Sequence, residues 1–388
     1  MTITNRWLLP EGVDEILPPK AMLLEQICRK LIDLFSTWGY EFVIPPMIEY
    51  LESLLTATGE DLDLQTYKVT DQLSGRLMGI RADITPQVAR IDAHLLQRDV
   101  PTRLCYLGSV LHSRTNNPGD SRSPLQLGAE LYGHAGVSSD IEIVKLMLAT
   151  FNSLGIRNIC MDIGHIGIFR SLISETKLSA EQKSEIFEIL KRKAKDELKI
   201  FYKKLKINDN NSKALLDLID LHGDVTVLDD AIHAFSKLSP NITKYIAEVK
   251  ALTESISDQS DASINIDLAE LRGYNYHTGM IYTAFVPNEG KGIAFGGRYD
   301  DIGSAFGRAR PATGFSTDVK QLLELHNIKD KKLDRILAPI NDDDLLSKKI
   351  TELREKGKIV IQELEGQNST VSEMNCNQLL VFEKNQWV

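Results

Sequence analysis

Three polar clusters, each set among apolar residues, hold the side chains of this chain that could do chemistry. The first, residues 81–87, reads Arg-Ala-Asp-Ile-Thr-Pro-Gln. If it is extended, Asp83 and Thr85 point to the same side, and a carboxylate beside a hydroxyl could hold an ammonium group. Asp or Thr could instead cap a helix that begins at Pro86, since both are favoured just before a first-turn proline. The cluster allows one group to serve each role.

The second cluster, residues 126–130, reads Gln-Leu-Gly-Ala-Glu. In a strand, Gln126, Gly128 and Glu130 share one face because side chains alternate. A glutamate on a central strand needs a partner, whereas on an outer face it would simply be solvated. Antiparallel sheets often keep one wet face, so both interpretations stay open here.

The third cluster combines glycines with aromatic residues that carry polar tips. It covers residues 271–279, Leu-Arg-Gly-Tyr-Asn-Tyr-His-Thr-Gly, and 296–300, Gly-Gly-Arg-Tyr-Asp. Glycine lets backbone approach a ligand closely, and tyrosine offers an apolar wall with a hydrogen-bonding end. Turn glycines beside packed tyrosines are the alternative, and no single cluster decides between them.

Motifs for other chemistries are missing. The chain has no GxxxxGKS/T phosphate loop, no GxGxxG, no HExxH and no GxSxG, and its eight histidines and four cysteines are dispersed. A metal site, a serine triad and a nucleotide cofactor are therefore unsupported, and we expect no cofactor and no catalytic residue of these types.

The first half of the chain must position these clusters with mixed helix and sheet. Apolar residues from Leu24 to Trp38 recur at helical spacing, Gly39 follows as a cap, and Pro45 ends the next strand. We expect further strands at 75–80, 104–112, 125–132 and 158–163, a helix at 141–154, and a polar loop at 113–123.

The second half predicts an inserted helical segment and a small terminal unit. Residues 176–258 are charged and helix-forming, with Ser179 and Gln182 in capping-box spacing, and the basic run 191–193 indicates a solvated face. Strands resume at 263–268 and 280–285, followed by glycine-rich stretches at 290–297 and 303–314. From about Lys331 we expect a strand at 335–340, a helix at 343–356 and strands at 358–361 and 378–382.

Size and charge exclude several classes of protein. The 388 residues predict two or three units, and 43% apolar with 26% charged residues excludes disordered and fibrous chains. A formal charge of −9 makes nucleic acid an unexpected partner. Scattered cysteines, no long apolar run and no leader-like N-terminus lead us to expect a cytoplasmic protein with reduced thiols and no membrane contact.

Taken in order, the clusters resemble the catalytic domain of histidyl-tRNA synthetase, a class II aminoacyl-tRNA synthetase. The similarity runs from about residue 8 to 325 and uses Pro10 to Gly12, the helix and strand before Pro45-Pro46, the three clusters above, and Gly314-Phe315 in motif 3. The resemblance implies an α+β fold, an antiparallel sheet flanked by helices. We expect a synthetase-like core at 1–328 with the helical insertion at about 176–258, and a small α/β domain at 329–388.

The resemblance also implies a histidine site. In that family an acid, a threonine and a motif 2 glutamine hold the ammonium group, which here are Asp83, Thr85 and Gln126. The imidazole would be read by Glu130, Tyr276, His277 and Tyr299, and the carboxylate would face Arg272 and Arg298. Asp83 stands where synthetases usually have Glu, and His277 where they have Tyr.

The nucleotide site departs from the family pattern. Motif 2 normally reads Phe-Arg-x-Glu, with Arg on the ATP α-phosphate, but residues 111–114 read Leu-His-Ser-Arg, so His112 and Arg114 occupy degenerate positions. Motif 3 normally ends in an Arg for the γ-phosphate, and Gln321 stands there. Losing two charge-assisted bonds costs roughly 3–6 kcal/mol, or about 10²–10⁴ in ATP use.

A histidine site without an ATP site resembles the family of synthetase-like regulatory subunits of short-form ATP phosphoribosyltransferase. That resemblance implies a non-catalytic homodimer within a hetero-octamer that activates the catalytic subunit and binds L-histidine for feedback inhibition in the first step of histidine biosynthesis. The short acidic tail makes tRNA binding an unexpected property. The alternative is a divergent histidyl-tRNA synthetase in which Arg114 or Arg122 restores ATP binding.

Overall fold

A computed structural model describes residues 7–56, 60–115, 120–207, 209–257, 261–271, 273, 276–327, 334–367 and 369–388. The chain divides into two compact units, Met1–Asn327 and Ile328–Val388. None of the helices within these described residues combines the length and apolar character that crossing a bilayer requires.

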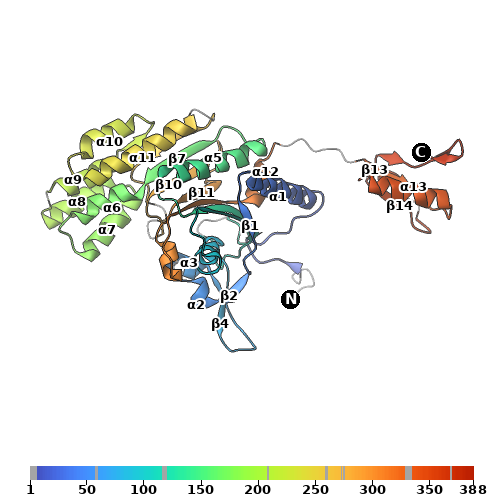
Figure 1. The fold of residues 1–388 in the computed structure, drawn as a ribbon, viewed down its shortest axis with the longest axis horizontal. Coiled ribbons are helices and arrows are strands. Elements are labelled where there is room, and N and C mark those ends of the chain that lie inside the picture. Colours follow the sequence, from blue (N-terminus) through green and yellow to red (C-terminus); the bar gives the residue numbers. More distant parts are fainter. Residues whose placement is uncertain are drawn as a thin grey trace. The chain divides into compact units, whose positions relative to one another are not determined.

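One large sheet organises the first unit (Figure 1). In the described part of the chain its order is β1-β5-β6-β12-β11-β10-β7-β9-β8. The bounds are β1 Glu41–Val43, β5 Thr102–Ser109, β6 Leu125–Tyr132, β12 Ala312–Asp318, β11 Ala294–Arg298, β10 Met280–Phe285, β7 Cys160–His165, β9 Ser263–Asp267 and β8 His222–Gly223. From β5 to β7 every neighbouring pair is antiparallel, while β1 with β5 and β7 with β9 are parallel. The predicted α+β fold with an antiparallel sheet is confirmed.

Helices α1 (Lys20–Thr37), α5 (Val137–Ser153) and α12 (Val319–Leu325) pack against this sheet. The helix predicted from Leu24 to Trp38 is α1, which buries its apolar stripe and brings Phe35 to 6.0 Å from Phe315 between ring centroids. Gly39 follows at φ +81°, a conformation that favours glycine. The helix predicted at 141–154 is α5, which begins four residues earlier.

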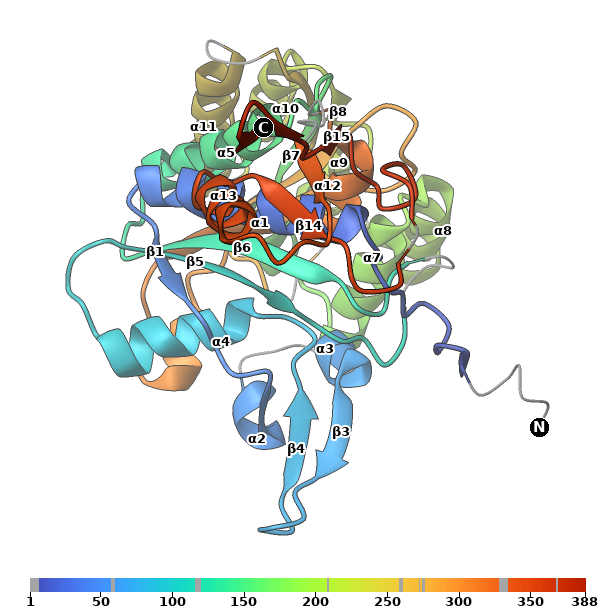
Figure 2. The ribbon, with the colours of Figure 1, turned by 90° about the vertical axis from the view of Figure 1, so that its right-hand side faces the viewer.

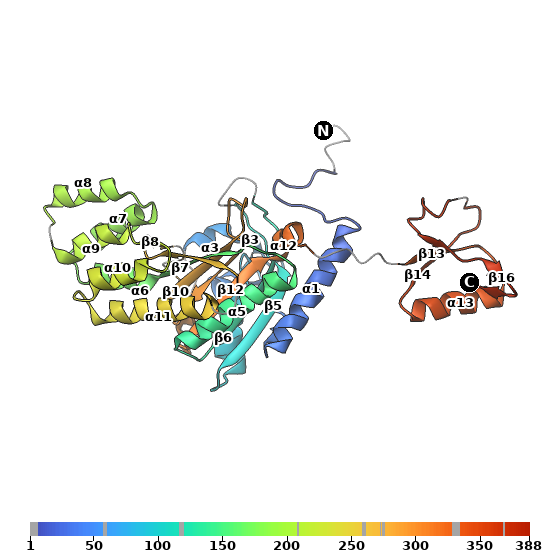
Figure 3. The same ribbon diagram turned by 90° about the horizontal axis from the view of Figure 1, so that it is seen from above.

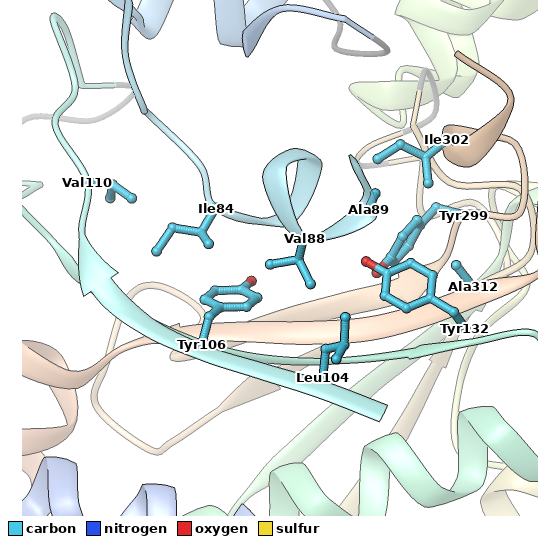
Figure 4. Packing of buried hydrophobic residues seen from close by; sticks show 10 residues of the cluster. All are labelled: Ile84, Val88, Ala89, Leu104, Tyr106, Val110, Tyr132, Tyr299, Ile302 and Ala312. Carbon is cyan, nitrogen blue, oxygen red and sulfur yellow. The ribbon is translucent and has the colours of Figure 1, made fainter. Parts of the chain in front are cut away.

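The other face of the sheet carries α4 (Thr85–Arg90), which continues into the short π-helix η2 (Ile91–Leu96). Val88 and Ala89 of α4 pack over Leu104, Tyr106 and Tyr299 in one buried cluster. Figure 4 shows α4 lying over the strands that carry these side chains. This is the face on which the polar clusters meet.

A smaller sheet, β2-β4-β3, stands beside the large one. Its strands are β2 (Ile48–Tyr50), β4 (Leu77–Ile80) and β3 (Tyr67–Thr70), with α2 (Leu51–Leu54) and α3 (Glu60–Gln65) between β2 and β3. Figure 2 shows the β3–β4 hairpin extending away from the body of this unit. The strand predicted at 75–80 corresponds to β4 with two fewer residues.

The charged segment after β7 folds as helices (Figure 3). They are α6 (Ile166–Ser174), α7 (Ala180–Lys191), α8 (Lys195–Leu205), α9 (Asn210–Leu218), α10 (Val227–Phe235) and α11 (Pro240–Ser257). The predicted capping box is present at α7, where Ser179 Oγ accepts from the Gln182 N–H and the Gln182 side chain accepts from the Ser179 N–H. The chain leaves the sheet after β7, adds the two-residue edge strand β8 between α9 and α10, and re-enters the sheet as β9, which pairs with both β7 and β8.

The second unit is a small parallel sheet, β14-β13-β15, with one helix. Its elements are β13 (Arg335–Ala338), α13 (Asp344–Glu355), β14 (Ile359–Gln362), β15 (Gln378–Leu379), β16 (Phe382–Glu383) and β17 (Gln386–Trp387). Leu346, Ile350 and Trp387 fill its core, and the Trp387 indole donates to Asp343 at 2.8 Å. The strand predicted over 378–382 is wrong at its end, because Phe382 leaves β15 to pair with Trp387 in a hairpin.

Candidate functional site

Strand register places the glutamate and the glycines of the predicted clusters on one face of the sheet. Glu130 of β6 lies directly opposite Gly314 of β12, and Gly314 lies directly opposite Gly297 of β11. Directly paired residues of antiparallel strands point to the same side, and Gln126 and Gly128 share that side because strand side chains alternate. Three of these five positions are glycines, namely Gly128, Gly297 and Gly314, and together they form a flat area of backbone that we call the glycine floor.

The glycine floor is required by the groups above it. A Cβ at Gly314 would lie 1.6 Å from Glu130 Oε2, and one at Gly128 would lie 2.3 Å from the Tyr106 hydroxyl. Real Cβ atoms do not come this close to other heavy atoms, so any side chain here would displace the carboxyl or the phenol. Because glycine has no side chain, the Glu130 carboxyl can lie directly against the backbone of β12 at Gly314.

Glu130 is the most deeply buried acid of the site, with 1% of its surface exposed. It accepts hydrogen bonds from the hydroxyls of Tyr106, at 3.1 Å, and Tyr299. Burial raises its pKa to about 8, an effect that the Tyr299 bond opposes and the nearby Asp83 charge reinforces. Near neutral pH the carboxyl can therefore be protonated or ionised, so it can either donate to or accept from a ring nitrogen.

The Asp83 cluster joins Glu130 through hydrogen bonds. Asp83 Oδ1 accepts from the Gln126 amide at 2.7 Å and from the Thr85 backbone N–H at 3.0 Å. The Gln126 carbonyl accepts from the Ile84 N–H at 2.9 Å. Asp83 thus bonds the first residue of α4, as its capping role predicts, and the same oxygen also bonds the strand β6. Its binding of an ammonium group stays a prediction.

Tyr106 is a site residue that the sequence reasoning missed. Its hydroxyl lies 2.9 Å from Thr85 Oγ1 and donates to Glu130, so it links the acid cluster to the strand cluster. Figure 4 shows its ring beneath α4, with Tyr132 and Tyr299 further along the same face. The Tyr132 hydroxyl is buried and has no hydrogen-bond partner in the described part of the chain. A strand was expected at 104–112, but only its register against β6 reveals that Tyr106 opposes Gly128.

An aromatic wall closes one side. Tyr276 and Tyr299 pack at 4.9 Å between centroids, and His277 meets Tyr276 edge-on at 5.3 Å. The His277 ring lies between Gly273 and Gly297, where added Cβ atoms would come within 2.5 and 2.7 Å of it. Burial lowers the pKa of His277 to about 4, which keeps its imidazole neutral at physiological pH.

Two polar atoms of this wall have no partner among the described residues. They are the Tyr276 hydroxyl and His277 Nδ1, and both are buried. Buried polar atoms are normally hydrogen-bonded, so unsatisfied ones beside a buried acid indicate a place for a polar ligand. The His277 carbonyl, by contrast, accepts from Arg170 of α6 at 2.9 Å.

Two arginines, Arg272 and Arg298, were predicted to face the ligand carboxylate. Arg298 was expected near a ligand carboxylate, and this placement is wrong. Arg298 is the last residue of β11 and follows Gly297, so it faces the side of the sheet opposite to Gly297, because side chains alternate along a strand. Its guanidinium is buried against Asp140 at the start of α5, at 2.7 Å, and also donates to Ser139 Oγ. It therefore anchors α5. Arg272 lies outside the described residues.

The degenerate nucleotide positions surround a different cavity. A hollow of about 550 Å³ is lined by His112, Arg114, Phe295 and Gln321, among others. His112 Nε2 lies 2.9 Å from the Ala82 carbonyl, and the Gln321 amide nitrogen is buried without a partner in the part of the chain that the structure covers. Arg114 is exposed at the rim.

Arg122, the other arginine that could have restored ATP binding, is engaged by the protein itself. Its side chain donates to the carbonyls of Glu11, His112 and Ser113 and to the Tyr67 hydroxyl. These bonds tie the N-terminal segment to the motif 2 loop. A guanidinium with four internal acceptors has few donors left for a phosphate.

Comparison with known sequences matches both units. Residues 12–322 match the sequence model of the family described as histidyl-tRNA synthetase, and residues 333–388 match the one described as ATP phosphoribosyltransferase subunit HisZ C-terminal domain. A protein of Thioalkalivibrio sulfidiphilus is 51% identical over all of this chain and 99% of its own length, and one of Nitrosococcus oceani is 46% identical over 100% and 97%. Both are named ATP phosphoribosyltransferase regulatory subunit.

Solved structures share the fold. The crystal structure of an ATP phosphoribosyltransferase regulatory subunit/histidyl-tRNA synthetase from Bacillus halodurans has a TM-score of 0.83 at 25% identity, covering 96% of this chain and 97% of that one. Histidyl-tRNA synthetase from Nostoc has a TM-score of 0.75 at 21% identity, covering 95% and 88%. The second similarity concerns the fold alone.

Proposed function

Because this chain belongs to the family of ATP phosphoribosyltransferase regulatory subunits, we propose that it activates a short-form catalytic subunit and makes that subunit responsive to histidine. In this role it is a regulatory subunit and not itself the catalyst. The assembly would be a homodimer of the synthetase-like core within a hetero-octamer that performs the first step of histidine biosynthesis.

The observation that carries the histidine assignment is the Glu130 network. Histidine presents an ammonium group and a ring with two nitrogens, and the pocket offers a matching group for each. Asp83, Thr85 and Gln126 provide oxygens for the ammonium, while Glu130 and the unsatisfied atoms of Tyr276 and His277 face the ring. A site that pairs with ring nitrogens rejects isosteres that lack them by a large factor.

The second cavity supports a role without catalysis. A synthetase must hold ATP phosphates, yet His112 and Gln321 stand where the resemblance leads us to expect arginines, and Arg122 is bound to the protein's own carbonyls. Asp318 also places a carboxylate at the lining of this cavity, where it repels phosphate. Histidine would therefore bind without being activated, which is what a sensor needs.

Feedback requires only a modest coupling between the histidine pocket and the catalytic partner. A coupling free energy of about 1–3 kcal/mol, from histidine binding one assembly state more tightly than another, shifts the equilibrium between the two states about 5- to 150-fold. The His277 carbonyl is bonded to Arg170 of α6, the helix that directly precedes the helical insertion, so α6 is one element through which a change at His277 could be transmitted.

The test is reconstitution with a short-form catalytic subunit. We expect the two chains to co-elute, the catalytic rate to rise on mixing, and added histidine to reduce it. Calorimetry on the isolated chain should show histidine binding, and histidinol, which lacks the carboxylate, serves as the matched ligand. A mixture that neither co-elutes nor changes rate would refute the regulatory role, whereas absence of histidine binding alone would refute only the pocket.

A further inference from the structure

A second large hollow, of about 730 Å³, lies among the helices of the first unit. Its walls come from the end of α1, one side of α5, the turn before β7 and the end of α11. It shares no lining residue with the Glu130 pocket or with the degenerate nucleotide cavity. Its volume falls within the range of small-molecule sites.

The arrangement of α5 explains why this space is not filled. One stripe of α5, with Val144, Met147 and Phe151, is buried against the sheet. The adjacent stripe, with Lys145, Ala149 and Asn152 at helical spacing, faces the hollow. Helix α11 packs along α5 and ends at Ser257, and its last residues line the hollow beside this stripe.

The charges of the hollow differ from those of the molecule as a whole. Lys145 and Arg157 contribute two cations to its lining and Asp261 one acid, although the whole chain carries −9. Lys145 is half-buried and makes no hydrogen bond or ion pair within the described ranges. Arg157 uses one donor on Asn152 Oδ1, at 2.5 Å, and has four others.

The remaining lining suits a planar, hydroxylated molecule. Trp38, the residue after α1, presents an indole on which a nucleobase can stack, and stacking of this kind is tolerant of base identity. Asn152, Asn158 and Ser257 add hydrogen-bonding groups. Two cations match a phosphate monoester, which carries about −1.5 to −2 charges at pH 7.

We infer that this hollow is a binding site for a phosphorylated nucleoside, with the base on Trp38 and the phosphate between Lys145 and Arg157. Arginine and lysine are the side chains that most often hold phosphate. The site stands apart from the histidine pocket, so it gives the protein a second, independent ligand.

Adenosine monophosphate is the probe, and the full-length chain is the sample. Calorimetry should give saturable binding at one site per chain, and adenosine, which lacks the phosphate, should bind at least about tenfold more weakly, as expected for loss of charge-assisted bonds. Binding should change tryptophan fluorescence, and Trp38→Phe should remove that change while calorimetry still detects binding.

A matched pair of lysine variants decides whether the charge matters. Lys145→Met should weaken binding about tenfold. Lys183→Met, at a half-buried lysine of α7 outside this cavity, should change it less than about twofold. Circular dichroism checks that both variants keep their helices.

Three outcomes would overturn the inference. They are no saturable binding up to about 10 mM, equal effects of the two lysine variants, and binding that leaves Trp38 fluorescence unchanged. The last result would place the nucleotide in another cavity. None of these outcomes bears on histidine binding, so this inference and the proposed function fail separately.

Discussion

The two ends of the β6–β12 strand pair offer a direct comparison. Toward one end, Glu130 and Gly314 oppose each other and support a closed network of tyrosine hydroxyls. At the other, Gln126 opposes Asp318, which lines the cavity where a synthetase would hold nucleotide. The first end holds groups that could recognise an amino acid, and the second presents the Asp318 carboxylate beside His112 and Gln321, where the resemblance leads us to expect arginines.

The contrast shows that one pair of strands can present different chemistry at its two ends. Each strand position holds its side chain through backbone pairing, which does not depend on the side chain. Asp318 therefore accepts bonds from the Leu125 and Lys320 N–H groups and caps α12 without disturbing Glu130. A charged side chain at one end of the strand pair therefore leaves the side chains at the other end in place, so the residues at the two ends can change independently.

The largest expected effect concerns the nucleotide end. In histidine-dependent ATP–pyrophosphate exchange, we expect this chain to be roughly 10²–10⁴ times slower than a histidyl-tRNA synthetase, because two charge-assisted phosphate contacts are missing. A histidyl-tRNA synthetase measured in parallel is the positive control. Exchange at the rate of that control would erase the contrast between the two ends.

Next in size is the loss of the buried acid. Glu130→Gln keeps the shape but removes the charge, and histidine should bind roughly 10- to 150-fold more weakly by calorimetry. Glu142→Gln is the matched control, because Glu142 is a partly buried glutamate held by Arg103 on the helix-covered face. An unchanged dissociation constant for Glu130→Gln, or an equal change in both variants, would show that the pocket lies elsewhere.

A pair of glycine substitutions sharpens the comparison through packing. Gly314→Ala puts a methyl group 1.6 Å from Glu130 Oε2, so we expect a loss of about 1–3 kcal/mol in the free energy of unfolding together with weaker histidine binding. Gly290→Ala, beside the nucleotide cavity, meets no atom within 4 Å and should change stability by less than about 0.5 kcal/mol. Chemical denaturation measures both, and equal losses would mean that the floor under Glu130 is not special.

The last prediction is a pH dependence of stability, which tests the buried carboxyl of Glu130. Burial raises the pKa of Glu130 to about 8 in the folded protein, so between the ordinary pKa of a glutamate and this raised pKa the folded state binds more protons than the unfolded state. Stability should therefore fall as pH rises through this window. Glu130→Gln should remove that part of the slope in denaturation experiments at several pH values. A wild-type slope identical to that of the variant would contradict the buried, shared carboxyl.

Local patterns were sufficient to predict much of the fold. Helix α1 with its glycine cap, helix α5, the capping box of α7 and the strands β5, β6 and β10 follow from periodicity and capping chemistry, which act over a few residues. The end of β15 did not follow, because pairing of Phe382 with Trp387 competes with continuation of the strand. Such competition between two partners has no local signature.

The site was predicted unevenly for the same reason. Asp83, Gln126 and Glu130 were identified from their types and spacing, and the structure brings them into one hydrogen-bonded network. Tyr106 was missed, and Arg298 was placed on the wrong face. The positions of both side chains depend on which residue lies opposite on the neighbouring strand. A register shift of one residue would move every side chain of a strand to the other face of the sheet.

The sequence by itself determined which side chains are available: an acid, an amide and tyrosines in three clusters, with His112 and Gln321 where the resemblance leads us to expect arginines. Only the tertiary structure decided how these groups are used. It buried Glu130 between two hydroxyls over a glycine floor, turned Arg298 toward Asp140, and engaged Arg122 with the protein's own carbonyls. The physical reason is that pKa, pairing and access depend on neighbours that are distant in the chain.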